Sequence, residues 1–330
     1  MLQRSVIISG MGVYLPKKMV SNDDLAQRID TSDEWIRSRT GIRQRRIAEG
    51  KQACSDLGAV AAQRAIDDAG LAPEAIDMVI VATITADMPF PSTACLLQAK
   101  LGLRSVPCFD VDAACSGFIY VLEIASALLL AGSYKHILIV GAEKLSSILD
   151  WEDRSTCVLF GDGAGAAVLS LSEEKGVGII ACQNSADGSK SDLLCMPGGG
   201  SLQPASIESL KARQHFLKME GREIFKAAIR LMAQSALSIL QEHKISPNEL
   251  SCIIPHQANA RIIDALAVRL RLSLDKFYIN LDKYGNTSAA SVPIALSEAK
   301  NLGRFGSGDY ILLLAFGAGL TWGASLIRWH

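Results

Sequence analysis

The chain has 330 residues, of which 49% are hydrophobic and 20% charged, and its mean hydropathy is +0.23. These values exclude a disordered chain, and the length predicts either two domains or two fused halves. A formal net charge of −1 and an isoelectric point near 6.5 argue against bulk nucleic-acid binding.

The eight cysteines are scattered without CxxC pairs, and most of them lie within apolar runs. This usage is typical of reduced thiols in a cytoplasmic protein, and the spacing of Cys and His predicts no zinc site. The N-terminus lacks the pattern of a signal peptide, and no stretch approaches the roughly 18 uncharged apolar residues that a membrane span needs. We therefore expect a cytoplasmic protein that does not cross a membrane.

Strand-like and helix-like segments alternate along the chain. Apolar runs rich in β-branched residues predict strands at residues 6–9, 78–83, 109–111, 137–140, 166–170 and 179–181. Capping residues and apolar periodicity predict helices at residues 22–29, 54–69 and 116–130, and a further helix that starts at residues 31–36. This alternation indicates an α/β fold.

Cys115 lies where the strand at residues 109–111 gives way to the helix that begins near Ser116. A thiol at a helix N-terminus meets free backbone N–H groups and the positive end of the macrodipole, which favour the reactive thiolate. Small residues on both sides of Cys115 leave room for a substrate carbonyl. A buried structural cysteine is the alternative interpretation, and it is the one we prefer for the other seven cysteines.

Two polar stretches far downstream supply the partners that a nucleophilic cysteine needs. His256 follows a buried strand within PHQAN, and Asn286 lies within YGNTSAAS. Cys, His and Asn far apart in sequence are typical of a nucleophilic site assembled by the fold. For His256 alone, a structural hydrogen-bonding role is the alternative. The stretch FGDGAG at residues 160–165 lacks the Lys-Ser/Thr ending of a P-loop, and we interpret it as a tight turn near the site.

The second half of the chain repeats the first at an offset of 174 residues. PEAIDMVI at 73–80 is similar to PNELSCII at 247–254 (247 − 73 = 174). Likewise, GS followed three residues later by ILIV, at 132–140, matches GS followed three residues later by ILLL, at 306–314 (306 − 132 = 174). Two similar α/β halves are the simplest explanation, and we place them at residues 1–172 and 173–330. The candidate site then lies at the seam, with Cys115 from the first half and His256 and Asn286 from the second.

Six motifs span nearly the whole chain in order: TSDEWIRSRTGIRQR, DAACSGF, FGDGAGAAVL, PHQANARI, YGNTSAASVP and AFGAGLTWG. Together they resemble β-ketoacyl-acyl carrier protein synthase III, of the thiolase superfamily. The resemblance implies a duplicated thiolase-like fold with five layers, α-β-α-β-α, usually in a homodimer. It also implies the decarboxylative condensation of an acyl-CoA primer with malonyl-acyl carrier protein, which initiates fatty acid synthesis and needs no metal or bound cofactor.

The same resemblance implies the roles of the reacting groups. Cys115 takes the acyl group, and the backbone N–H groups of Cys115 and Ala318 form the oxyanion hole, although the family often has Gly where Ala318 stands. His256 and Asn286 donate hydrogen bonds to the malonyl thioester carbonyl, on which decarboxylation develops enolate charge.

Further positions match substrate contacts of the family. The matches to CoA contacts are Trp35, Arg39, Thr40, Arg154, Arg222 and Phe225. The expected primer pocket consists of Phe90, Phe160, Leu217, Met219 and Phe316. Phe90 matches a residue that reaches into the partner's pocket, and its bulk predicts a small primer such as acetyl. Lys226 and Arg261 match positions at which the carrier protein docks. A solvated charged face is the alternative for the helical stripe of Arg222, Lys226 and Arg230.

Three other functions remain open from the sequence. A related condensing enzyme of quinolone or polyketide assembly would share Cys115, His256 and Asn286, and only its substrates would distinguish it. A papain-like thiol hydrolase also uses Cys, His and Asn, but the 174-residue repeat and the missing local Cys signature argue against it. A non-catalytic acyl-CoA or acyl-carrier-binding protein would not need all three side chains.

Overall fold

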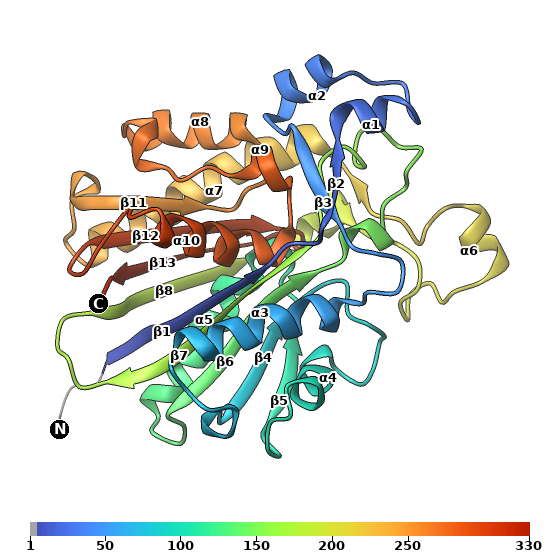
Figure 1. The fold of residues 1–330 in the computed structure, drawn as a ribbon. Helices are drawn as coiled ribbons and strands as arrows, with labels where there is room; N and C mark the ends of the chain where they lie inside the picture. Colours follow the sequence, from blue (N-terminus) through green and yellow to red (C-terminus); the bar gives the residue numbers. More distant parts are fainter. Residues whose placement is uncertain (1–4) are drawn as a thin grey trace.

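A computed structural model describes residues 5–330 of the chain. Two mixed β-sheets form its framework (Figure 1). The first has the order β1 (Ser5–Tyr14), β7 (Gly163–Ser172), β6 (His136–Glu143), β4 (Met78–Ala82), β5 (Cys108–Val111). The second has the order β11 (Leu250–Pro255), β12 (Tyr310–Gly317), β13 (Thr321–Arg328), β8 (Gly178–Ala186). Strands β6, β4 and β5 run parallel in the first sheet, and β11 and β12 run parallel in the second, while β7 and β13 are antiparallel to their neighbours.

The longer helices cover the faces of these sheets. They are α3 (Cys54–Asp68), α4 (Thr93–Lys100), α5 (Gly117–Leu130), α7 (Gly221–Glu242), α8 (Ala260–Leu270) and α10 (Ser291–Asn301). The shorter ones are α1 (Asn22–Ala26), α2 (Asp33–Thr40), α6 (Ile207–Lys211) and α9 (Leu281–Tyr284). Among residues 5–330, no helix has both the length and the apolar character required to cross a membrane.

The apolar cores show how these elements are layered. One core joins α5 and α10 to the facing sides of both sheets, so these two helices form the middle layer. A second core packs α3 and α4 on the outer side of the first sheet, and a third packs α7 and α8 on the outer side of the second. This confirms the expected five-layer α-β-α-β-α architecture. Complete burial of β4 explains why its sequence is a continuous apolar run.

The 174-residue repeat recurs in the secondary structure. Strand β6 begins at His136 and β12 at Tyr310 (310 − 136 = 174), and α5 begins at Gly117 and α10 at Ser291 (291 − 117 = 174). The short 3-10 helices that precede α5 and α10, η2 (Ala114–Ser116) and η7 (Ser288–Ala290), also differ by 174 (288 − 114 = 174). Their first residues share a left-handed backbone, with φ of 45° at Ala114 and 48° at Ser288. Cys115 and the segment that follows Asn286 therefore occupy equivalent places in the two halves.

The first sheet uses strands up to Ser172 and the second uses strands from Gly178 onward. On this basis we propose the division at residues 172 and 173, with residues 1–4 of the first half outside the described residues. The predicted strands at 6–9, 166–170 and 179–181 lie within longer strands. Buried glycines extend β1 and β7, at residues 10–12 and 163–165, and the polar residues 183–185 extend β8.

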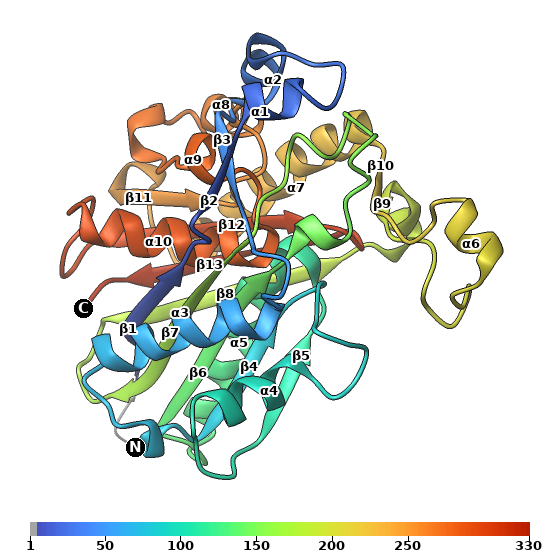
Figure 2. The same cartoon turned by 45° about the vertical axis from the view of Figure 1, so that its right-hand side comes forward.

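Two segments project from the layered body (Figure 2). Helices α1 and α2, together with the ribbon of β2 (Lys18–Ser21) and β3 (Gln44–Ile47), lie beside α8. The ribbon of β9 (Leu194–Cys195) and β10 (Lys218–Met219) leads to a lobe that carries α6. Both segments border the carboxyl ends of the parallel strands, where α/β folds commonly place their sites.

Candidate active site

Cys115 is the middle residue of η2, between the end of β5 and the start of α5, and only 6% of its surface is exposed. The predicted position at a strand-to-helix junction is confirmed. The prediction that this position favours the thiolate is wrong for the resting enzyme, because burial raises the pKa of the Cys115 thiol to about 12. Packing between the two halves removes the sulfur from water, and that loss of solvation outweighs the local benefit of a helix start.

The hairpin between β12 and β13 lies directly against the nucleophile. A Cβ atom on Gly317 would fall 2.6 Å from the Cys115 backbone nitrogen, so this close approach requires glycine. Ala318 follows, and among residues 5–330 its amide makes no hydrogen bond with another protein group. Cys115 and Ala318 line the same cavity. The Ala318 amide is thus an available backbone donor in a residue that lines the same cavity as Cys115.

His256 lies one residue beyond the end of β11 and is 4% exposed. Its Nδ1 is 2.5 Å from Oγ of Ser291, the first residue of α10. The amide of Gln257 donates to that same oxygen at 3.4 Å, which favours a Ser291 hydroxyl that donates its own proton to Nδ1. Burial lowers the pKa of His256 to about 3, so the imidazole is neutral. A neutral ring that accepts at Nδ1 carries its proton on Nε2.

Asn286 lies between α9 and η7, and backbone hydrogen bonds hold it against the segment that leads into β7. The backbone nitrogen of Asn286 donates to the backbone carbonyl of Leu159 at 2.8 Å, and the backbone nitrogen of Gly161 donates to the backbone carbonyl of Asn286 at 2.9 Å. A Cβ on Gly161 would meet the carbonyl of Tyr284 at 2.3 Å. Residues 160–165 lie near the site, as expected, because Phe160 lines the pocket of Cys115. The interpretation as a tight turn is wrong, because residues 163–165 already form the start of β7. Oδ1 of Asn286 accepts from the amide of Ser288 at 2.8 Å, which leaves the side-chain NH₂ free to donate.

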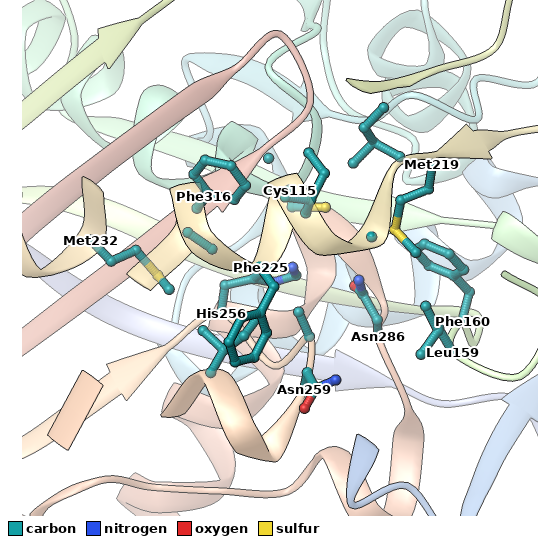
Figure 3. A pocket seen from close by; sticks show the side chains of 17 residues that line it. Cys115, Leu159, Phe160, Met219, Phe225, Met232, His256, Asn259, Asn286 and Phe316 are labelled. Carbon is teal, nitrogen blue, oxygen red and sulfur yellow. The ribbon is translucent and has the colours of Figure 1, made fainter. Parts of the chain in front are cut away.

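Cys115, His256 and Asn286 line one pocket (Figure 3). In that view the side chains of His256 and Asn286 lie on the same side of Cys115, and Phe225 and Phe316 form parts of the wall. The three candidate residues come from η2, the end of β11 and the turn before η7, so two halves of the chain are needed to bring them together. The described residues contain no group of His, Cys, Asp and Glu side chains arranged to hold a metal ion.

A second cavity, of about 400 Å³, meets the first at Cys115 and Phe160. Leu145, Leu217 and Ala318 are among its lining residues. Cys115 therefore borders two cavities, one that contains His256 and Asn286 and one that contains Leu217 and Ala318.

Comparisons with known proteins agree with this geometry. A family profile described as 3-Oxoacyl-[acyl-carrier-protein (ACP)] synthase III matches residues 109–188, and one described as its C terminal matches residues 240–329. Beta-ketoacyl-[acyl-carrier-protein] synthase III of Caldanaerobacter subterraneus subsp. tengcongensis is 53% identical, over 98% of this chain and 97% of the relative. The chain belongs to the 3-oxoacyl-[acyl-carrier-protein] synthase III family. It is thus an acyltransferase that carries out the condensation initiating fatty acid synthesis.

Solved structures of related enzymes are similar to this chain in both fold and sequence. The 3-oxoacyl-[acyl-carrier-protein] synthase III of Aquifex aeolicus VF5 is 49% identical, with a TM-score of 0.92, over 98% of this chain and 100% of that chain. The priming beta-ketosynthase of the R1128 polyketide biosynthetic pathway is 34% identical, with a TM-score of 0.91, over 99% of this chain and 96% of that chain. The thiolase-like fold of the family is thus shared along the whole length of this chain.

Most residues expected to contact CoA gather beside the first pocket. The guanidinium carbons of Arg39 and Arg154 lie 4.5 and 5.2 Å from the ring centroid of Trp35. Phe225 lines the pocket, and Arg222 is exposed in the first turn of the same helix, α7.

Thr40 differs from the other expected CoA contacts, because it is buried and its hydroxyl is already engaged. The hydroxyl donates to the carbonyl of Ile36 at 2.7 Å and accepts from the amide of Ile42 at 3.0 Å. Thr40 therefore stabilises the end of α2, and its side chain is not free to bind a nucleotide.

The residues expected to form the primer pocket are divided between the two cavities. Phe160 and Leu217 line the second cavity, whereas Met219 and Phe316 line the first. Phe90 lines neither cavity of its own chain and is 84% exposed.

The two expected docking residues lie near the mouth of the first pocket. Lys226 is exposed, forms an ion pair with Glu223 at 2.8 Å and lines a shallow groove with Arg230 and Arg269. The Arg261 guanidinium lies 5.8 Å from the ring centroid of Phe225.

Several residues of the site were not singled out from the sequence. Ser291 and Ser288, which contact His256 and Asn286, lie in the motif YGNTSAASVP, so that motif was a usable signal. Glu143 is the last residue of β6 and is completely buried near Cys115. Nothing in its local sequence distinguishes it from the polar end of an ordinary buried strand.

Proposed function

We propose that Cys115 accepts the acyl group of a CoA primer and that His256 and Asn286 then drive decarboxylation of malonyl-acyl carrier protein. The observation that carries this proposal is the convergence of these three side chains on one pocket, next to a cavity that Cys115 shares with Ala318. Attack of the sulfur on the primer thioester produces a tetrahedral oxyanion, which the amides of Cys115 and Ala318 stabilise. CoA leaves, and the acyl group remains on the enzyme.

In the second half of the reaction, the malonyl thioester carbonyl accepts from Nε2–H of His256 and from the Asn286 NH₂. Loss of carbon dioxide develops negative charge on that oxygen, so both donors bind the transition state more tightly than the ground state. The carbanion carbon then attacks the acyl carbon on Cys115. The neutral state of His256 suits this role, because a neutral imidazole can donate from Nε2 without having to lose a proton. All of these steps use protein groups alone, so we propose that the enzyme needs no bound cofactor.

The two cavities suggest how the substrates are placed. We assign the pantetheine arm to the first cavity, along Phe225, with Met219 and Phe316 as walls close to the reacting thioester. The nucleotide would lie near Trp35, Arg39 and Arg154, with Arg222 at the entrance. The acyl group would occupy the second cavity, along Phe160 and Leu217.

The primer is proposed to be acetyl-CoA, in a homodimer in which Phe90 reaches the partner's pocket. The second cavity of a single chain is much larger than an acetyl group, so the size limit must come from an added side chain, and the exposed Phe90 is the candidate. We expect acetyl-CoA to be used roughly tenfold or more better than octanoyl-CoA in kcat/KM, and Phe90→Ala to reduce that preference. Steady-state kinetics with both primers check this, and a native preference for octanoyl-CoA would contradict it.

Docking of the acyl carrier protein is proposed at the face that carries Lys226 and Arg261. Charge reversal at both positions, Lys226→Glu with Arg261→Glu, should raise KM for malonyl-acyl carrier protein by roughly tenfold, because the carrier protein is acidic. Acetyl transfer from CoA to the enzyme should be unaffected. Lys175→Glu, at the exposed turn between β7 and β8, is the matched control. An unchanged KM in the double variant would exclude this docking surface.

A panel of acyl-CoA primers and malonyl thioesters tests the function as a whole. We expect β-ketoacyl-carrier protein to form from acetyl-CoA and malonyl-acyl carrier protein, and we propose that this reaction takes place in the cytoplasm. The second candidate is the priming reaction of polyketide assembly, which is supported by the 34% identical R1128 enzyme. Preference for a longer primer or for another malonyl acceptor would favour that second function.

A further inference from the structure

A buried carboxyl group, that of Glu143, lies near the nucleophile. Glu143 is fully buried, and Oγ1 of Thr85 donates to its Oε2 at 2.5 Å. The Thr83 hydroxyl and the Ile84 amide donate to the carboxyl group at 3.3 Å. Among residues 5–330, no Lys, Arg or His forms an ion pair with it. A buried carboxyl group without a cation is costly to ionise, so its retention beside a reacting sulfur needs a reason.

The Ser288 hydroxyl provides a connection between this carboxyl group and the sulfur. Ser288 is fully buried, and its Oγ has no hydrogen-bond partner in the resting structure. It lies beside both the Cys115 thiol and the Glu143 carboxyl group, and it lines the second cavity together with Cys115. The backbone of Ser288 is left-handed, with φ of 48°, and its amide donates to Oδ1 of Asn286 at 2.8 Å, so the position of Ser288 is tied to that of the site.

We propose that Glu143, through the Ser288 hydroxyl, accepts the Cys115 proton during acylation and returns it when condensation frees the sulfur. This inference rests on the proposed function, because it requires that Cys115 is acylated. His256 is poorly suited to the same task. Its neutral ring already carries a proton on Nε2, which is the atom proposed to face the substrates, and its Nδ1 is engaged with Ser291.

The proton movements balance over the two half-reactions. In acylation, the C–S bond to Cys115 forms while the thiol proton passes to Ser288 Oγ and the Ser288 proton passes to Glu143. The C–S bond to CoA then breaks, and CoA leaves as a thiolate that takes a proton from water. In condensation, the new C–C bond forms, the bond from carbon to the Cys115 sulfur breaks, and Glu143 returns its proton through Ser288. The carboxyl group thus holds one proton for the lifetime of the acyl-enzyme.

The surroundings of Glu143 suit a group that changes its protonation state. Burial raises the pKa of Glu143 to about 7, so that both states are accessible under ordinary conditions. The titratable groups that face it are the thiols of Cys54, on α3, and Cys115. The adjacent Lys144 directs its ammonium group away, to the carbonyls of Gly50 and Gln52.

The test is a single-turnover measurement of CoA release from acetyl-CoA between pH 5.5 and 9. In the native enzyme the rate should rise with pH and level off above about 7, because only ionised Glu143 accepts the proton. In Glu143→Gln the plateau should disappear and the rate at pH 7 should fall by roughly 10²-fold. Ser288→Gly, which suits the positive φ, should behave in the same way. Glu123→Gln, a carboxyl-to-amide change on α5, is the matched control and should leave the profile unchanged.

The alternative is that Glu143 acts on Cys115 only through its charge, and it predicts the opposite effect of Glu143→Gln on the rate of CoA release. The charge of Glu143 raises the pKa of Cys115, so its removal alone would make the thiol easier to ionise. Glu143→Gln that releases CoA as fast as the native enzyme, or faster, would overturn the relay. If Glu143→Gln does not fold, Ser288→Gly with a native pH profile would overturn it equally. Native enzyme that releases no CoA would instead refute the proposed function.

Discussion

Cys115→Ala should lower the rate of β-ketoacyl formation by at least about 10⁴-fold, since no other group in the pocket can carry the acyl chain. The same variant should still decarboxylate malonyl-acyl carrier protein, because His256 and Asn286 remain in place. The measurement is product formation alongside release of carbon dioxide. Cys157→Ala is the matched control, because Cys157 is fully buried and lines neither cavity at the site.

Misfolding of Cys115→Ala would also abolish both activities, so circular dichroism must first show that the variant is folded. Condensation at the native rate would mean that the acyl group is carried elsewhere or not carried at all. Condensation at the native rate would contradict the proposed role of Cys115 as the acyl carrier. Loss of decarboxylation in a folded variant would contradict the proposal that His256 and Asn286 alone promote that step.

His256→Ala should lower condensation by about 10²–10³-fold, and Asn286→Ala by a similar factor, because each change removes one donor from the developing enolate. The two losses should not add fully in the double variant, since both donors serve the same oxygen. Acetylation of Cys115 should continue in both single variants. His243→Ala, at the C-terminal end of α7 and outside the pocket, is the matched control.

The pH dependence of the same step follows from the state of His256. Its pKa is lowered to about 3, so the charged imidazolium forms only below that value and the neutral donor persists at higher pH. Protonation of His256 should therefore cause no fall in decarboxylation between pH 8 and pH 5. Decarboxylation is followed as release of carbon dioxide from malonyl-acyl carrier protein.

Loss of Cys115 acetylation in His256→Ala would contradict the proposed roles, because it would mean that the imidazole is the base that deprotonates the thiol.

Much of this site could be predicted from local sequence. Cys115 and His256 each follow the end of a predicted strand, and Asn286 lies in a segment rich in small residues, so strand prediction and the repeat placed all three at one seam. The state of the thiol could not be predicted in this way. The helix-start argument considers only local backbone, whereas the pKa of Cys115 depends on burial by β12 and η7 from the other half.

Glu143 and the lobe around α6 were missed for different reasons. Glu143 ends an apolar strand, and it comes close to Cys115 only when β6 packs against η7. That packing is tight, because a Cβ on Gly141 of β6 would meet the carbonyl of Ala289 of η7 at 2.4 Å. The lobe between β9 and β10 has few apolar residues in a regular period, so the sequence showed no element there. Leu202 and Ile207 in this lobe are 98% and 67% exposed, which explains the absence of a core pattern.

Acylation of the sulfur is the claim on which the other steps depend, and mass spectrometry of the native protein after incubation with acetyl-CoA tests it most directly. Intact protein should gain the mass of one acetyl group per chain, and peptide analysis should locate it on Cys115. Addition of malonyl-acyl carrier protein should then remove the acetyl group as product forms. A protein that forms product without ever carrying the acetyl group, or that carries it on a residue other than Cys115, would contradict the account.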